Sequence, residues 1–438
     1  MTPGARAQTA IELLDGLPKS GPADQHLSRY FRRHRFVGAK DRRAIAQLVY
    51  DVLRRRAQLD WWIADAGAGA GNVHNRMRVL AALALIEHWP ADAIAAAFDG
   101  GQYRPTPLAD DERRIVERIT PGEPELVAAG QPGWVRNNYP EWLEAALQVS
   151  LGDGLDRELG ALLNPAPVDL RVNRLKGTRE AARRLLADEG VESEPTPLCP
   201  DGLRLAARRT LPSLKAFSQG FVEVQDEGSQ LAALLVDAKP GQAVADYCAG
   251  GGGKTLAMAA TMRNEGSILA SDTDEARLRS LGPRLRRAGV TIAEGTLLDD
   301  DGAGEGLEPG AFDRVLLDVP CSGTGAWRRS PDAKWRLSEQ ELLDEVERQR
   351  AILTAAAELP KIGVGRLVYV TCSILQEENE NQIEWFLAQR SDYAVLPIDE
   401  VWAATVGGVA PVPGPALRLS PAGTATDGFF VAVMERRA

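Results

Sequence analysis

The spacing of apolar residues divides the chain into regions of different structure. Over the first 120 or so residues apolar positions recur every three to four residues, as in RRAIAQLVYDVLRRRAQLDWWI (42–63) and MRVLAALALIEHW (77–89). This period is typical of amphipathic helices. The run Val79–Ile86 is apolar throughout but far shorter than a membrane span, so it predicts a buried helix. The first region therefore predicts an all-α bundle.

The next region contains the signals of a boundary followed by a small mixed fold. Pro121, Pro124, Pro132 and Pro140 interrupt the helical pattern. Beyond them, the strand candidates VDLRVNRL (168–175) and GLRLA (202–206) flank a helical segment at 178–190. We predict a small α+β segment here.

From Phe217 onward, short apolar strands alternate with helices. The predicted strands are FVEVQ, QAVADYC, SILASD, FDRVLLD and GRLVYVTC. Repeated βαβ units predict a parallel, doubly wound α/β sheet that is covered on both faces. The segment 417–435 predicts two further strands, added antiparallel at the sheet edge. The predicted domains are 1–125, 126–215 and 216–438.

Composition and charge narrow the classes of protein. The chain has 438 residues, 44% hydrophobic and 26% charged, which is typical of a globular protein of two or three domains. The N-terminus lacks the apolar stretch of a secretory signal, so we expect a cytoplasmic protein without membrane segments. The net charge of −10 argues against a uniformly basic nucleic-acid binder.

The negative average conceals a basic segment near the N-terminus. Residues 1–60 hold twelve Lys/Arg against six Asp/Glu. Aromatic residues are interleaved with the cations of Arg29–Arg43, and Arg54–Arg56 follow. Such a face can neutralise phosphates, although a solvated helix surface has the same pattern.

Cysteines and histidines limit the possible chemistry. The four cysteines show no C-x-x-C spacing, and all four histidines lie in the first fifth of the chain, so we expect free thiols, no metal site and no local Cys-His dyad. Two cysteines stand out because each ends an apolar strand and precedes a serine: Cys321 in RVLLDVPCSGTG and Cys372 in GRLVYVTCS. With Asp318 they would meet at one sheet edge, where one thiol could attack a substrate and the other resolve the adduct.

A glycine-rich turn between a predicted strand and helix, ADYCAGGGGKT (245–255), predicts a ligand site. A Walker A loop would need glycine at Cys248, so that interpretation fails. A dinucleotide fingerprint is matched only trivially by a glycine run. S-adenosylmethionine would require an acid at the end of the next strand, and Asp272 stands there.

These motifs resemble the RsmB/Sun (Fmu) family of bacterial 16S rRNA cytosine-5 methyltransferases over nearly the whole chain. The resemblance rests on the segments RAQTAIELL and 38–63, LRVNRLKGTRE, VQDEGSQL, CAGGGGK, DVPCSGTG, TCS and DGFFVA. The resemblance implies an N-terminal NusB-like RNA-binding domain. It also implies a Rossmann-like class I methyltransferase domain with a mostly parallel seven-stranded sheet.

The resemblance also implies roles for individual residues. Cys372 would add to carbon 6 of cytosine, Asp318 would hold the base, and Cys321 would assist loss of the carbon-5 proton and release of Cys372. Lys254 would contact Asp318. S-adenosylmethionine would bind Cys248, Ala249, Gly250, Gly251, Gly252, Gly253, Lys254, Asp272, Asp299 and Asp318. Asp300 or Asp301 could replace Asp299 beside the adenine.

Three expectations concern activation and substrate. Ser373-Ile-Leu-Gln376 fits a capping box, so a helix N-terminus could promote ionisation of Cys372. WRRSPDAKWR (327–336) offers side chains suited to single-stranded RNA. The expected substrate is an unstacked cytosine of 16S rRNA, acted on by a monomer. The same chemistry on tRNA, or a non-catalytic RNA-binding assembly factor, are the alternatives.

Overall fold

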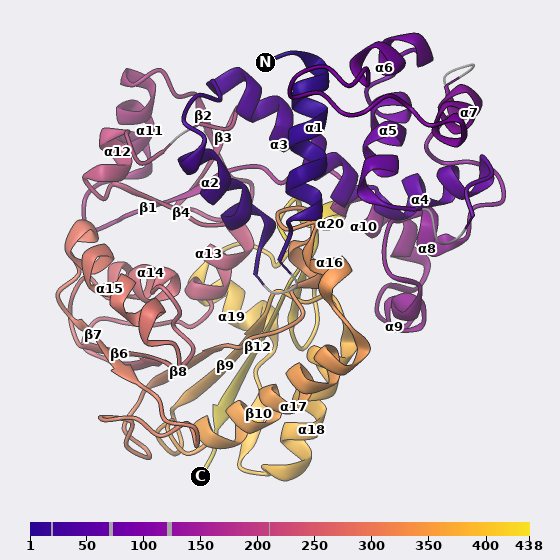
Figure 1. Ribbon diagram of the computed structural model, residues 1–438. Coiled ribbons are helices and arrows are strands. Elements are labelled where there is room, and N and C mark those ends of the chain that lie inside the picture. The colour runs from indigo at the N-terminus through magenta and orange to yellow at the C-terminus, as the bar shows by residue number, and fades with distance from the viewer. Residues whose placement is uncertain (19–20, 70–72, 121–124, 210) are drawn as a thin grey trace. The chain divides into compact units, whose positions relative to one another are not determined.

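A computed structural model describes residues 1–18, 21–69, 73–120, 125–209 and 211–438, and the chain divides into two compact units (Figure 1). The first, here the helical unit, comprises residues 1–164 and 327–339. The second, here the sheet unit, comprises residues 165–326 and 340–438. Pro121 and Pro124 of the predicted boundary lie outside the described residues. Within the described residues, no helix is both long and apolar enough to cross a membrane.

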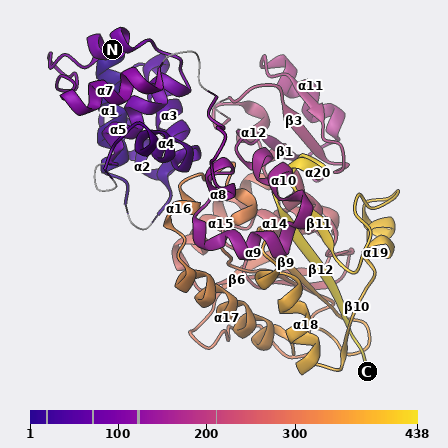
Figure 2. The ribbon, with the colours of Figure 1, turned by 90° about the vertical axis from the view of Figure 1, so that its right-hand side faces the viewer.

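The helical unit contains the predicted bundle, visible as the indigo helices of Figure 2. Helix α5 is its centre, since Val79 to Leu85 are each at most 3% exposed. The predicted buried helix at this apolar run is confirmed. The α-helices are α1 (Pro3–Asp15), α2 (Ala23–Arg33), α3 (Ala39–Arg54), α4 (Arg56–Asp65), α5 (Asn75–Leu85), α6 (Ala91–Ala97), α7 (Asp110–Ile119), α8 (Gly133–Arg136), α9 (Glu144–Leu151), α10 (Leu155–Leu162) and α16 (Ala333–Arg336).

Local capping sets where two of these helices begin. The hydroxyl of Thr2 accepts a hydrogen bond from the amide of Ala5, and Pro3 occupies the first turn of α1, where no amide donor is needed. His74 accepts from the amide of Met77 and so caps α5.

The sheet unit begins with a small antiparallel sheet in the order β2-β3-β1-β4. Its elements are β1 (Asp169–Val172), α11 (Arg179–Asp188), β2 (Ser193–Pro195), β3 (Gly202–Leu205), α12 (Lys215–Ser218) and β4 (Val222–Val224). The predicted strand FVEVQ forms as β4, but its predicted place in the parallel sheet is wrong. It pairs with β1 because Leu170 and Val224, and Val172 and Val222, stand opposite one another.

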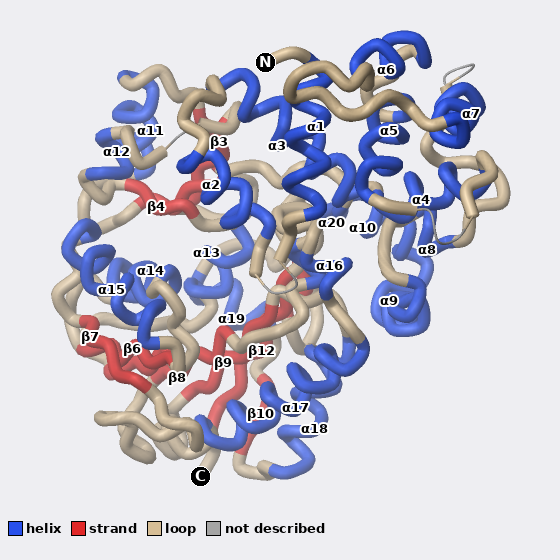
Figure 3. Tube along the Cα trace, viewed as in Figure 1, coloured by secondary structure: helices blue, strands red, loops and turns tan. Residues whose placement is uncertain are grey.

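The larger sheet has the order β10-β12-β9-β8-β5-β6-β7, and β11 pairs with β12 (Figure 3). Strands β7, β6, β5, β8 and β9 are parallel, as predicted, while β12 is antiparallel to β9. The strands are β5 (Ala243–Asp246), β6 (Ser267–Asp272), β7 (Ala293–Leu297), β8 (Arg314–Asp318), β9 (Arg366–Thr371), β10 (Tyr393–Val395), β11 (Leu417–Leu419) and β12 (Phe429–Arg436).

Helices cover both faces of this sheet because successive strand residues point to opposite sides. In β8, Leu316 packs with residues of α13, α14 and α19, whereas Val315 and Leu317 pack with residues of α17 and α18. The α-helices of this part are α13 (Glu227–Leu234), α14 (Gly253–Thr261), α15 (Glu275–Ala288), α17 (Glu339–Ala356), α18 (Glu380–Gln389), α19 (Ile398–Thr405) and α20 (Pro421–Thr424).

The larger sheet differs from the prediction in its number of strands and in the position of β12. It has eight strands instead of seven, and β12 lies inside the sheet instead of at its edge. One side of β12 pairs with β9, and the other pairs with β11 near Phe429 and with β10 near Arg436. Strand β7 was missed because it is a largely exposed edge strand without an apolar run.

Candidate active site

The glycine loop follows β5 and leads into α14. Gly250 and Gly252 have φ values of +55° and +77°, in the left-handed region that favours glycine. A Cβ on Gly252 would also overlap the side chain of Leu281, whereas a Cβ on Gly250 would meet nothing within 4 Å. The loop is thus tightly packed at its helix end and open beside Gly250.

Asp246 holds the loop in place from beneath. This carboxyl at the end of β5 is fully buried and accepts a hydrogen bond of 2.6 Å from the hydroxyl of Thr255 in α14. Burial raises its pKa to about 6. Sequence analysis missed Asp246, although an acid at the end of a strand before a glycine turn was the available signal.

Asp272 ends β6 beside the same loop, at the position the cofactor interpretation requires. Its Oδ2 accepts from the amide of Gly250 at 2.8 Å, and its Oδ1 accepts from the amide of Asp274 at 2.8 Å. A carboxylate has about four acceptor positions, so this one can still accept hydrogen bonds from ribose hydroxyls. The open loop at Gly250 and this acceptor fit S-adenosylmethionine.

Asp299 occupies a turn after β7. Its side chain is exposed, and its Oδ1 accepts from the amides of Asp301 at 3.0 Å and Ala303 at 2.8 Å. Asp299 therefore shapes its own turn. A contact from Asp299, Asp300 or Asp301 to the adenine stays a prediction.

Asp318 lies at the end of β8 and is paired with Lys254 of α14. The Nζ of Lys254 donates to the Oδ2 of Asp318 at 2.6 Å, which is the contact that the resemblance implies. The lysine side chain is 8% exposed and the aspartate side chain 34% exposed. The ion pair therefore holds a carboxylate that solvent, or a substrate, can still reach.

The structure brings the two strand-end cysteines together. Strands β8 and β9 are parallel neighbours with Asp318 opposite Val370, so the loops that follow them run side by side. The Sγ atoms of Cys321 and Cys372 lie 3.5 Å apart. The amide of Gly325 donates to the carbonyl of Cys372 at 2.9 Å and ties the loops together.

The environment makes Cys321 hard to ionise. Its hydrogen bond with Cys372, burial and the nearby charges of Cys372 and Glu378 raise the pKa of Cys321 well above that of an ordinary thiol. Burial likewise raises the pKa values of Cys248 and of Cys199, the latter to about 12. All four cysteines are free thiols.

The predicted capping box after Cys372 is wrong. The hydroxyl of Ser373 accepts from the amide of Leu375, and the next helical turn is a 3-10 segment, Gln376–Glu378. Helix α18 begins only at Glu380, with Asn379 as the preceding cap residue. Local hydrogen bonds to Thr371, Thr324 and Asn379 hold Ser373 instead, so the predicted helix N-terminus directly after Cys372 does not form.

The segment 327–336 is also placed differently from the prediction. Trp327, Arg328 and Lys334 are at most 5% exposed, within the helical unit, and so are not an open RNA-binding surface. Lys334 donates to the carbonyl of Arg54 at 3.1 Å, and burial lowers its pKa well below the ordinary value. The ammonium group of Lys334 also lies over the rings of Trp327 and Trp335, so these side chains contact one another inside the helical unit.

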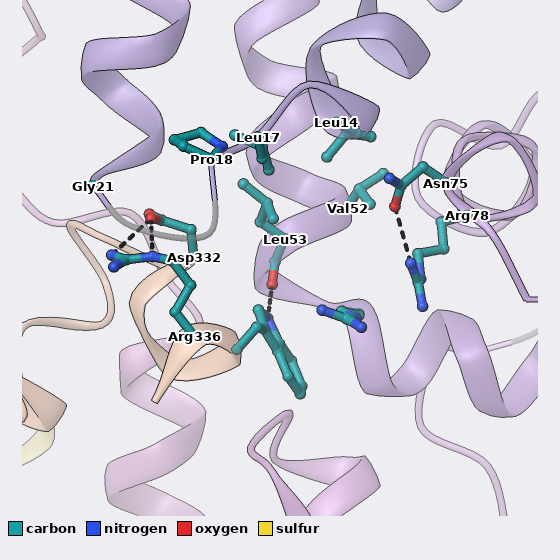
Figure 4. Close-up of a pocket in the computed structure, with 12 residues that line it drawn as sticks. Leu14, Leu17, Pro18, Gly21, Val52, Leu53, Asn75, Arg78, Asp332 and Arg336 are labelled. Carbon is teal, nitrogen blue, oxygen red and sulfur yellow. Dashed lines mark hydrogen bonds and ion pairs between the residues drawn. The ribbon is translucent and has the colours of Figure 1, made fainter. Parts of the chain in front are cut away.

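A cavity of about 230 Å³ adjoins this segment in the helical unit (Figure 4). Its wall is apolar at Leu14, Leu17, Val52 and Leu53 and polar at its remaining sides, where Asn75, Arg78, Asp332, Trp335 and Arg336 lie. The polar groups are already engaged: Asn75 with Arg78, Asp332 with Arg336, and Trp335 with the carbonyl of Leu53. Arg56, which also lines the cavity, pairs with Asp60 at 3.8 Å, so each of these polar side chains has a partner within the helical unit.

The basic segment near the N-terminus forms an exposed surface on α2 and α3. Phe36, between the two helices, is 77% exposed. The cations around it are also exposed and comprise Arg29, Arg32, Arg33, Arg35, Lys40 and Arg43. We call this set the basic face. An exposed aromatic among cations suits a phosphate backbone with an unstacked base.

Comparison with known proteins identifies the family. Residues 233–435 match the family model "16S rRNA methyltransferase RsmB/F", and residues 139–211 match its ferredoxin-like domain. The probable ribosomal RNA small subunit methyltransferase B of Synechocystis is 30% identical over 99% of both chains. The chain belongs to the RsmB/F family. The ribosomal RNA small subunit methyltransferase B of Pectobacterium carotovorum is 32% identical over 93% of this chain and 94% of its own length.

Solved structures show the same fold. The crystal structure of PH0851 superposes with a TM-score of 0.79 and 27% identity, and the match covers 100% of this chain and 99% of that one. NSun6 from Pyrococcus horikoshii, solved with SFG, has a TM-score of 0.59 over 68% of this chain and 98% of its own; at 21% identity it shows the fold alone. The RsmB/F member described here is thus an S-adenosylmethionine-dependent rRNA methyltransferase with the predicted Rossmann-like fold.

Proposed function

We propose that this RsmB/F member forms 5-methylcytosine in 16S rRNA through a covalent bond between Cys372 and the target base. The approach of two thiols to 3.5 Å carries the proposal, beside a carboxylate whose partner is a buried lysine. Carbon 5 of cytosine is a weak nucleophile. A thiolate that adds to carbon 6 pushes an electron pair to carbon 5 and splits one difficult step into easier ones.

Each residue of the site has a part in this scheme. Cys372, as the thiolate, forms the sulfur–carbon 6 bond. Asp318, held by Lys254, binds the ring nitrogen and exocyclic amine and stabilises the charge that develops there. When bound, S-adenosylmethionine supplies the methyl group that carbon 5 accepts.

Release of the product falls to Cys321. Cys321 first gives up its own thiol proton to water, and its thiolate then accepts the carbon-5 proton. The electrons of that carbon–hydrogen bond restore the ring double bond, and the carbon–sulfur bond breaks with its electron pair returning to Cys372 as the thiolate. The thiol of Cys321 lies within contact distance of Cys372, so a base bonded to Cys372 at carbon 6 would present its neighbouring carbon 5 near Cys321. A raised pKa makes a Cys321 thiolate a strong proton acceptor once it is formed.

The proposed RNA partner is an unstacked cytosine of 16S rRNA. The small-subunit names of the similar proteins support this RNA, and the basic face, in the proposed 1–125 RNA-binding domain, supports binding of phosphates. The domains 126–215 and 216–438 would complete the enzyme, acting as a monomer in the cytoplasm. Base chemistry on RNA requires a base outside the stack, so a loop or bulge is the proposed target.

Labelled methyl transfer tests the proposal. The protein is incubated with S-adenosylmethionine carrying a labelled methyl group and with 16S rRNA or tRNA, and modified cytosines are mapped. We expect label at carbon 5 of a 16S cytosine. Transfer to tRNA alone would replace the substrate, and label on another atom of the base would overturn the chemistry.

A further inference from the structure

Glu378 is a buried carboxylate beside the two cysteines that neither the sequence motifs nor the proposed chemistry uses. It lies in the 3-10 turn after Cys372 and is 0% exposed. Its Oε1 accepts from the amide of Ser322 at 2.7 Å, and its Oε2 accepts from the hydroxyl of Ser322 at 2.5 Å. A buried carboxylate is costly unless such donors compensate it, so this arrangement fixes Ser322 closely.

The opposite side of the Cys321 loop is held through Gln349 of α17. Its Nε2 donates to Oε1 of Glu378 at 3.0 Å and to the carbonyl of Pro320 at 3.0 Å. Gln349 is itself 0% exposed. The residues on both sides of Cys321 are therefore fixed by one buried network whose central acceptor is Glu378.

The same carboxylate belongs to the segment that carries Cys372. Asn379, the next residue, donates through Nδ2 to the carbonyl of Ser373 at 3.0 Å. The hydroxyl of Tyr369, in β9, donates to the carbonyl of Glu378 at 2.7 Å. Glu378 is thus anchored to the strand and loop of Cys372 while its side chain holds the loop of Cys321.

We propose that Glu378 is a positioning residue that keeps the thiol of Cys321 beside Cys372. Its function in catalysis, which rests on the proposed cytosine chemistry, is to hold Cys321 ready for the step that releases Cys372 from the product. The carboxylate accepts three hydrogen bonds, from the amide and hydroxyl of Ser322 and from the Nε2 of Gln349. Glu378→Gln removes the negative charge that strengthens all three and places an NH2 group opposite the hydroxyl of Ser322, which must then turn to accept.

The rate of disulfide formation between Cys321 and Cys372 reports how close the two thiols lie, and its measurement needs no RNA. Diamide, a thiol oxidant, takes two electrons and two protons from Cys321 and Cys372, is reduced to the hydrazine, and leaves one sulfur–sulfur bond. We expect this disulfide, quantified by mass spectrometry of peptides, to form about tenfold more slowly in Glu378→Gln, because weaker neutral hydrogen bonds hold the loop of Cys321 less firmly at the contact of 3.5 Å. Glu384→Gln, an exposed change on α18, should keep the wild-type rate.

Ser322→Ala provides a second variant if Glu378→Gln fails to fold. It removes the hydroxyl donor and retains the amide donor, so we expect slower disulfide formation by a few-fold. Alkylation of Cys372 by iodoacetamide should keep its wild-type rate in both variants, because Thr371, Thr324 and Asn379 still hold the segment that follows Cys372. Wild-type rates of disulfide formation in folded Glu378→Gln and Ser322→Ala would overturn the proposal, as would absence of the disulfide in the wild-type protein.

Turnover with RNA supplies the catalytic readout. Glu378→Gln should accumulate the covalent protein–RNA complex and lose about tenfold in kcat, while KM for S-adenosylmethionine changes less than about twofold. Unchanged kcat in this variant would overturn the positioning role in catalysis. If the wild-type protein transfers no methyl group but the disulfide rates differ as expected, the proposed function fails and the positioning of Cys321 stands.

Discussion

The Sγ atom of Cys321 lies 3.5 Å from that of Cys372, although 51 positions separate them in the chain. The two residues meet because β8 and β9 are parallel neighbours and their carboxyl ends lie at one edge of the sheet. The hydrogen bond from the amide of Gly325 to the carbonyl of Cys372 also ties the two loops together. Because the two thiols lie this close together, substitution of each one in turn tests whether they have different roles in the reaction.

Replacing each cysteine should stop the reaction at a different stage. Cys372→Ala removes the nucleophile, so we expect no methyl transfer and no covalent complex. Cys321→Ala leaves the nucleophile but impairs release, so we expect a protein–RNA complex that survives denaturing electrophoresis. Methyl transfer by Cys372→Ala at the wild-type rate would show that the roles are exchanged or mistaken.

Loss of the lysine partner of Asp318 should impair chemistry more than stability. Lys254→Met removes a charge-assisted hydrogen bond of 2.6 Å, worth about 1.5–3 kcal/mol, so we expect kcat to fall about ten- to a hundredfold. Lys239→Met is the matched control, because Lys239 is 62% exposed in its ion pair with Asp237. Equal activities of the two variants in a single-turnover methylation assay would contradict a role for the Lys254–Asp318 pair.

Two glycine substitutions should separate backbone strain from steric overlap. Gly252→Ala combines a φ of +77° with overlap against Leu281, so we expect a loss of about 2–5 kcal/mol in the free energy of unfolding. Gly241→Ala has a φ of +85° but no atom within 4 Å of its new Cβ, so we expect about 1–2 kcal/mol. Urea unfolding measures both.

Binding of S-adenosylmethionine should distinguish the same two variants. Gly252 belongs to the cofactor loop, whereas Gly241 lies in a turn before β5. We expect calorimetry to show weaker binding by about tenfold or more for Gly252→Ala, because its amides are displaced, and unchanged binding for Gly241→Ala. Unchanged binding in Gly252→Ala would remove the loop from the cofactor site.

The buried carboxyl of Asp246 should make stability fall as pH rises from about 4 to 6. Its pKa is about 6 in the folded protein, against 3.8 ordinarily, so across this range the folded protein binds more protons than the unfolded chain. The contribution of Asp246 to the free energy of unfolding therefore decreases between pH 4 and pH 6, by at most about 3 kcal/mol. Above pH 6 this contribution no longer changes with pH.

Asp246→Asn isolates this contribution because the amide does not titrate. The difference in the free energy of unfolding, wild type minus variant, should decline between pH 4 and pH 6 in urea titrations. A difference that is constant or rises across that range would show that Asp246 does not carry the raised pKa.

The basic face should contribute to RNA affinity through counterion release. Arg32→Gln, Arg33→Gln and Arg35→Gln combined should weaken RNA binding and reduce the slope of log affinity against log salt by about 2, if all three contact a single strand. Filter binding at several salt concentrations gives the slope.

Helix α7 supplies a matched control with the same charge change. Arg113→Gln, Arg114→Gln and Arg118→Gln combined remove three exposed cations from the same unit. The salt slope should stay at the wild-type value in this triple variant. Equal slopes for both triple variants would show that net charge, and not the basic face, controls RNA binding.

The sequence determined the elements whose local pattern is strong. The apolar run of α5, the parallel strands β5, β6, β8 and β9, and the glycine loop were all predictable, because side-chain periodicity and glycine geometry act within a few residues of chain. The strand-end rule also placed Asp272, Asp318, Cys321 and Cys372 at one edge. Their common edge follows from parallel strand order alone.

Tertiary packing decided what local patterns leave open. FVEVQ joins the small sheet because its apolar side chains match β1, and β12 enters the sheet interior because both of its edges find partners. The sequence pattern around Trp327 and Lys334 predicted an exposed nucleic-acid-binding surface, but both side chains are buried in the helical unit. Burial depends on contacts with residues that are far away in the sequence, so the pattern of a short segment cannot predict it.

The active site shows the same division. The sequence by itself determined which functional residues stand at or just after the ends of β6, β8 and β9, since strand patterns are local, but it did not reveal the role of Asp246 at the end of β5. Only the tertiary structure decided that Glu378 and Gln349 surround Cys321 and that Ser373 does not cap a helix. A hydrogen bond between side chains depends on positions within fractions of an ångström, which packing across the whole fold sets.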